Sequence, residues 1–139
     1  MVDIRIKNCV VKGLHASNFM VQPGDNYECR EDPNQYDQNC IGVFNFNTLV
    51  GHAPYQLSVA LTTALQNGAT VFCLVKGIPR NSTFPWPEIW QQHGGLIADC
   101  EYIIPLASGD LHKLQITLDS LDETINNILP WCQVCLEFL

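Results

Sequence analysis

Positively charged residues are scarce in this sequence. There are 7 Lys and Arg residues against 14 Asp and Glu, which gives a formal net charge of −7. Non-specific nucleic-acid binding draws most of its affinity from cations that contact phosphates. This charge balance excludes a surface that is basic over most of its area and binds nucleic acid non-specifically. The protein must therefore either concentrate its few cations in one place or bind another kind of ligand.

Long apolar runs are also missing. No stretch reaches membrane-spanning length, and the first seven residues alternate polar and apolar positions where a secretory signal would be continuously apolar. We therefore expect a soluble, intracellular protein, with the nucleus as one option. The 139 residues are 47% hydrophobic and 15% charged, which suits one globular domain with an extension.

Catalytic signatures are absent as well. The sequence has no Gly-rich phosphate loop, no G-x-S-x-G and no HExxH, so we expect a binding module and no enzyme. Among its 7 cysteines, Cys9, Cys40 and Cys73 lie in apolar runs, which favours reduced, buried thiols. Cys132 and Cys135 have the spacing of half a zinc site, but they lie in an apolar tail, and we expect no metal and no cofactor.

The periodicity of apolar residues predicts a mainly β, or α+β, fold. Strands are expected at about 4–11, 27–31, 39–46, 49–50, 69–78 and 96–105, with the last two paired. Between the fourth and fifth strands, Leu57, Leu61 and Leu65 lie on one helical face after Pro54. We expect a helix over residues 55–67, with Asn67-Gly68 as its stop.

The composition changes after residue 105. Residues 107–109, Ala-Ser-Gly, form a plausible boundary, and Ser120 to Glu123 has the pattern of a capping box. A helix of about ten residues should follow and end at Pro130, with its apolar face either packed on the preceding β domain or open to a partner. We predict a domain over 1–105 and a C-terminal extension with one helix over 106–139.

One polar stretch and a Gly-His step resemble the HIRAN domain family. The resemblance covers about residues 2–105 and implies a small OB-like barrel of about six strands with one inserted helix. The residues that carry it are Arg30, Asp32, Pro33, Asn34, Tyr36, Asp37, Asn39, Ile41, Val43, Val50, Gly51, His52 and Pro54.

This resemblance implies a pocket for the 3′ end of single-stranded DNA, in a repair or remodelling context. Tyr36 would stack on the terminal base, and Asp37 would accept a hydrogen bond from the terminal hydroxyl. Asn34 and His52 would be their polar neighbours. Further stacking surface is expected from Tyr55, Phe84 and Trp86.

Departures from the family pattern keep a second hypothesis open. His15-Ala16 replaces an expected Arg-Tyr, Tyr55 replaces a basic residue, and residues 27–55 carry a net charge near −3 by our count of one Arg against four acids. Asp32 to Asn34 and Asp37 to Asn39 could simply cap turns. The alternative function is a protein-interaction module that keeps the HIRAN fold without binding DNA.

Overall fold

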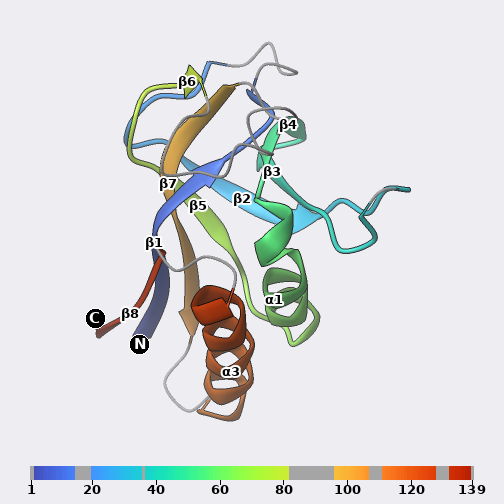
Figure 1. The fold of residues 1–139 in the computed structure, drawn as a ribbon, viewed down its shortest axis with the longest axis vertical. Helices are drawn as coiled ribbons and strands as arrows, with labels where there is room; N and C mark the ends of the chain where they lie inside the picture. Colours follow the sequence, from blue (N-terminus) through green and yellow to red (C-terminus); the bar gives the residue numbers. More distant parts are fainter. Residues whose placement is uncertain are drawn as a thin grey trace.

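The computed structural model describes residues 2–14, 20–35, 37–81, 96–106, 111–127 and 132–138. Its backbone forms one antiparallel sheet, and two helices lie side by side against one end of it (Figure 1). The strands are β1 (Val2–Val11), β2 (Asn26–Glu31), β3 (Ile41–Asn45), β4 (Thr48–His52), β5 (Phe72–Val75), β6 (Arg80–Asn81), β7 (Leu96–Leu106) and β8 (Gln133–Phe138).

The sheet closes into a barrel. The strands follow the order β4-β3-β2-β5-β7-β1-β8, with β6 paired to β7. An isolated antiparallel bridge between Lys12, just after β1, and His52, at the end of β4, joins the first strand of this order to the sixth. The bridge closes six strands into the barrel, in the order β4-β3-β2-β5-β7-β1. The predicted mainly β, barrel-like fold is confirmed.

A glycine permits this closure. A Cβ placed on Gly51 would lie 2.6 Å from the carbonyl oxygen of Lys12 and 2.9 Å from Cγ2 of Val11. Both distances are shorter than carbon side chains tolerate, so only glycine allows β4 to approach the end of β1 this closely.

Alternating residues of the strands fill the core beneath the helices. Ile4 and Ile6 of β1 and Tyr102 of β7 are fully buried, and the Tyr102 hydroxyl donates to the Val10 carbonyl at 2.8 Å. Helix α1 (Tyr55–Gln66) adds Leu57, which is also fully buried. All seven cysteines are free thiols, and five of them are buried: Cys9, Cys29, Cys73, Cys100 and Cys132.

Helix α1 confirms the prediction from periodicity. It begins one residue after Pro54 and ends at Gln66, directly before the predicted stop. Asn67 ends the helix by donating to the Thr63 carbonyl from its backbone N–H at 3.1 Å and from its side-chain amide at 2.8 Å. These bonds satisfy a carbonyl that the helix itself leaves without a partner.

The prediction for the C-terminal helix was wrong in its start. Helix α3 (Leu111–Asn127) has 17 residues, and the proposed capping box at Ser120 lies inside it. The helix extends further toward the N-terminus because its buried face includes Thr117, which is 1% exposed, four residues before the fully buried Leu121. A polar residue at a core position concealed that periodicity. Leu121 belongs to the main core, so of the two alternatives the apolar face of the helix packs on the barrel.

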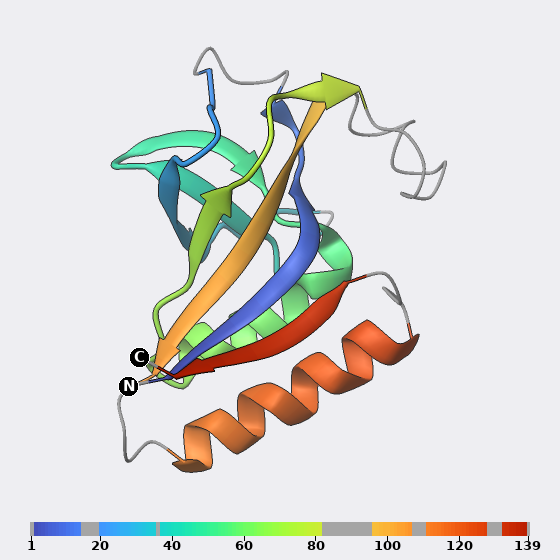
Figure 2. The ribbon, with the colours of Figure 1, turned by 90° about the vertical axis from the view of Figure 1, so that its left-hand side faces the viewer.

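Strand β8 was not predicted from the sequence. The apolar tail pairs antiparallel with β1, from Val2 opposite Phe138 to Lys7 opposite Gln133. Figure 2 shows β8 running along β1, with α3 beside it. The C-terminal residues therefore add a strand to the same sheet, and the expected division at 105/106 falls within β7, which ends at Leu106.

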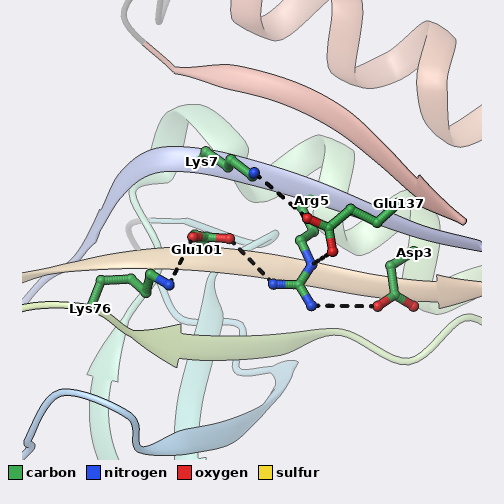
Figure 3. Close-up of polar contacts among 6 residues, drawn as sticks. All are labelled: Asp3, Arg5, Lys7, Lys76, Glu101 and Glu137. Carbon is green, nitrogen blue, oxygen red and sulfur yellow. Dashed lines mark hydrogen bonds and ion pairs between the residues drawn. The ribbon is translucent and has the colours of Figure 1, made fainter. Parts of the chain in front are cut away.

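An ion network links β8 to β1 and β7 through β1 residues that alternate with the buried Ile4 and Ile6 (Figure 3). Arg5 lies at its centre, 3.5 Å from Glu101, 3.7 Å from Asp3 and 2.9 Å from Glu137, the last contact being an ion pair without the alignment of a hydrogen bond. The network balances three acids with three bases: Asp3, Glu101, Glu137, Arg5, Lys7 and Lys76. Asp3 and Glu101 are buried, so this arrangement gives them the counter-charges that burial requires.

Candidate ligand-binding rim

The polar residues between β2 and β3 build a tight turn. Asp32 donates its backbone N–H to the Cys40 carbonyl at 2.8 Å, and Asn34 donates to the Asp37 carbonyl at 3.1 Å. The side-chain oxygen of Asn34 accepts from the Asp37 N–H at 3.0 Å. The turn-capping role considered for Asn34 from the sequence is therefore confirmed, and it fixes the shape of this loop.

Asp37 is held from two sides. Its Oδ1 accepts the Asn39 N–H at 2.9 Å, and its Oδ2 accepts the Ser58 hydroxyl of α1 at 2.9 Å. A carboxylate oxygen has two lone pairs, so each oxygen can accept one further hydrogen bond. The turn and the helix together present a fixed carboxylate with free acceptor capacity.

Tyr55 lies on the same face of α1 as Ser58. Residues three apart on a helix are neighbours, and Ser58 is bonded to Asp37. Tyr55 is 59% exposed. An exposed aromatic ring therefore stands at the start of α1, one helical turn before the serine that binds Asp37.

His52 is the last residue of β4, and two residues separate it from α1. Its Nε2 lies 3.3 Å from Oδ2 of Asp32, which joins β4 to the turn. On the other side of the ring, a Cβ on Gly13 would lie 3.5 Å from Nδ1. Gly13-Leu14 and Gly51-His52 are therefore neighbours in space. We call Asn34, Asp37, His52 and Tyr55 the rim.

Cross-strand register adds two cations that the sequence did not single out for this site. In the strand ladders, Arg30 lies opposite Gly42, Gly42 lies opposite His52, and His52 lies opposite Lys12. These four residues therefore form one row across β2, β3, β4 and the end of β1. Residues directly opposite each other share a face of the sheet. Burial lowers the pKa of Lys12 from its usual value. No local sequence signal could have revealed this row, because its residues are far apart in the chain and become neighbours only through strand pairing.

Cys40 lies among the acids of the turn. Burial raises the pKa of its thiol to about 11, with Asp37 and Asp32 adding to the effect and a hydrogen bond with Asn34 opposing it. The group is therefore a neutral thiol near pH 7. This protonation state makes it a poor nucleophile.

The structure describes four of the seven predicted site residues: Asn34, Asp37, His52 and Tyr55. Tyr36, Phe84 and Trp86 lie outside the described residues, as do His15 and Ala16. Within the described part of the chain, no group of three or more His, Cys, Asp or Glu residues could hold a metal ion. No helix in that same part is long and apolar enough to cross a membrane.

Comparison with known proteins rests on structure alone. No family model and no curated protein matches the sequence. The HIRAN domain of human HLTF is a structural match, with a TM-score of 0.63, 20% sequence identity, and coverage of 88% of this chain and 92% of that one. A protein from Lactobacillus plantarum gives a TM-score of 0.49 at 15% identity, over 74% of this chain and 97% of that one.

The closed barrel with its inserted helix therefore defines a small β-barrel protein. More particularly, this chain has a HIRAN-like fold.

Proposed function

We propose that the rim binds the end of a single nucleic-acid strand, as a binding module that serves DNA repair or remodelling. The observation that supports this most is the Asp37 carboxylate, which Ser58 and Asn39 hold in place while leaving acceptor capacity on both oxygens. A fixed carboxylate suits a terminal hydroxyl, which can donate to it. An internal phosphate cannot donate, and its charge would be repelled.

Limited cationic support is available for the adjoining backbone. Lys12 and Arg30 lie at the two ends of the cross-strand row that contains His52. Arg30 is also paired with Glu28 at 3.1 Å, which reduces its attraction for phosphate. We therefore expect binding to depend weakly on salt, with a slope on the order of one or two released counterions.

Stacking would complete the site. Tyr55 offers an exposed ring one helical turn before Ser58, which binds Asp37, and Tyr36, Phe84 and Trp86 remain predicted contributors. Base stacking on an aromatic side chain is worth about 1 to 3 kcal/mol per base. A carboxylate for the hydroxyl and one or two rings for the bases would recognise a strand end without reading its sequence.

Fluorescence anisotropy with labelled single strands tests the proposal. A dT10 strand with a free 3′-hydroxyl should bind, and the same strand with a 3′-phosphate should not. Asp37→Ala should abolish binding as well, and circular dichroism would show whether the variant still folds. Equal affinity for the free and the blocked strand would exclude end recognition at Asp37.

A matched control separates lost contact from lost structure. Ser58→Ala removes one of the two bonds that hold Asp37 but keeps its carboxylate. It should weaken binding less than Asp37→Ala does. Equal losses would mean that the position of the carboxylate, rather than its presence, decides the affinity.

A second candidate is a protein-interaction module without nucleic-acid binding. The acidic residues around the cross-strand row favour it, since Glu28 and Asp32 pair with Arg30 and His52, which would otherwise face a phosphate. Failure of every strand to bind in the anisotropy experiment, with the protein folded, would select this candidate.

A further inference from the structure

The hairpin of β3 and β4 carries an apolar surface next to the cross-strand row that contains His52. Phe46, in the turn between the two strands, is 85% exposed, and Leu49 is 37% exposed. Phe44 lies opposite Leu49 in the β3–β4 ladder and opposite Glu28 in the β2–β3 ladder. We call Arg30, Phe44, Phe46 and Leu49 the hairpin patch.

Phe46 adopts an unusual backbone conformation. Its φ is +55°, in the left-handed region that suits glycine or asparagine and is rarely adopted by a bulky residue. The guanidinium of Arg30 donates to the Phe46 carbonyl at 2.6 Å and so supports the turn. An exposed aromatic side chain on a strained backbone adds nothing to the core. Its place in the turn therefore points to a role outside the core.

Phe44 and Leu49 lie opposite each other in the hairpin, two and three residues from Phe46 along the chain. A Cβ on Gly42 would lie 2.7 Å from Cε2 of Phe44 and 3.0 Å from Cδ1 of Leu49, so both side chains lie over the glycine. The guanidinium carbon of Arg30 is 4.8 Å from the centre of the Phe44 ring. This cation–π contact orients the ring, and the absence of a side chain at Gly42 makes room for it.

The surroundings of the hairpin patch are acidic. Glu28 lies 3.1 Å from the Nε of Arg30 and compensates its charge, while a Cβ on Gly42 would be 3.2 Å from Cβ of Asp32. An open groove of about 310 Å³ adjoins the patch, lined by Glu28, Arg30, Glu31 and Leu65 among others. The one cation of the patch is therefore already paired, and the neighbouring carboxylates favour a positively charged ligand.

We propose that the hairpin patch binds a basic peptide segment of a partner protein, with one aromatic anchor flanked by Lys or Arg. The anchor ring packs against Phe44, Phe46 and Leu49, and its flanking cations face Glu28, Asp32 and the groove at Glu31. Aromatic residues and arginine are the usual anchors of such interfaces. This inference goes beyond strand-end recognition and does not depend on it, and it gives the protein-interaction candidate a definite surface.

A defined probe tests the proposal on the whole chain. The peptide Gly-Lys-Arg-Trp-Lys-Arg-Gly is titrated into ¹⁵N-labelled protein and followed by NMR. Saturable shifts should centre on residues 28–32 and 42–49. Replacing the central Trp by Ala, or all four cations by Glu, should weaken the affinity at least tenfold in each case.

Two matched variants test the anchor contact. Phe46→Gly removes the ring and relieves the strain at φ +55°, so it should weaken peptide binding at least tenfold while leaving the melting temperature equal or higher. Phe138→Ala removes another exposed ring, 81% exposed on β8, and should leave peptide binding unchanged. Undiminished binding by Phe46→Gly overturns the proposal.

Other outcomes are equally decisive. The proposal fails if the peptide does not saturate, if its shifts map away from the hairpin, or if dT10 occupies the hairpin patch more tightly than the peptide does. Asp37→Ala should leave peptide binding intact, so failure of strand-end recognition and failure of this proposal are separate results.

Discussion

Lys12 and His52 exchange both backbone hydrogen bonds, at 2.8 and 2.9 Å, and this pair joins the end of β1 to β4. The same pair brings the Lys12 side chain to the face that His52 occupies. Closure of the barrel and assembly of the candidate site therefore depend on one contact, and that contact depends on the missing side chain of Gly51.

We expect Gly51→Ala to destabilise the protein by about 1 to 3 kcal/mol, because the added methyl meets a backbone oxygen that cannot rotate away. Urea denaturation measures the change. Gly77→Ala is the control, since its nearest contacts, on Asp99, lie at an ordinary 3.4 Å. Equal effects of the two substitutions would contradict the role given to Gly51.

Arg5→Met should also destabilise the protein. The substitution removes the cation that lies beside Asp3. It also removes one of the two cations beside Glu101, which keeps Lys76. We expect the free energy of unfolding to fall by about 1 to 3 kcal/mol. Arg80→Met breaks a more exposed pair with Asp99 and should cost about 0 to 1 kcal/mol. Equal unfolding free energies for the two variants in urea would show that burial adds nothing to the Arg5 network.

The Cys40 thiol should react slowly near neutral pH. Since its pKa is about 11, the thiolate fraction and the rate of alkylation by iodoacetamide should rise about tenfold per pH unit from pH 7 to 10. Mass spectrometry of the labelled Cys40 peptide measures the rate. A rate that levels off below pH 9 would contradict the raised pKa.

The raised pKa of Cys40 also makes the stability of the folded protein depend on pH. The usual thiol pKa of 9.0 is lower than the value in the folded protein, so unfolding favours release of the proton. The contribution is fully present below pH 9 and is lost as the pH rises toward 11. Cys40→Ser should therefore lose less stability over that interval than the unchanged protein, as denaturation at pH 8 and pH 11 would show.

A chain shortened to residues 1–106 should unfold less cooperatively or aggregate, because it lacks β8 and the buried Leu121. Leu121→Ala in the full chain should cost about 2 to 5 kcal/mol. Both are followed by thermal denaturation. An unchanged midpoint for the shortened chain would instead support the predicted domain boundary at 105/106.

Local patterns were sufficient for most of the regular structure. Period-two alternation located β1 and β2, and the helical period between Pro54 and Asn67 located α1 almost to the residue. The paired strands β5 and β7 were also predicted, although β5 is shorter than expected. These elements share a clear signal, since each has one apolar face and turn residues at its ends.

Weaker patterns misled the prediction of the C-terminal part. Thr117 occupies a core position in α3, so a start at Ser120 looked better capped than the true one at Leu111. The tail after Cys132 looked merely apolar. The tail forms a strand because it pairs with the edge of β1 that no other described strand occupies. A sequence does not show which edge of a sheet is unoccupied.

The local patterns of the sequence determined the mainly β class, the inserted helix and the turn chemistry of Asn34 and Asp37, because these follow from residues close together in the chain, whereas the barrel was implied by the resemblance to the HIRAN family. The tertiary structure decided that Asp37 meets Ser58, that Asp32 meets His52, and that Lys12 and Arg30 flank the same row. The reason is physical. Strand register and barrel closure bring together residues that are distant along the chain, and side-chain periodicity specifies the face of a strand but not its partner.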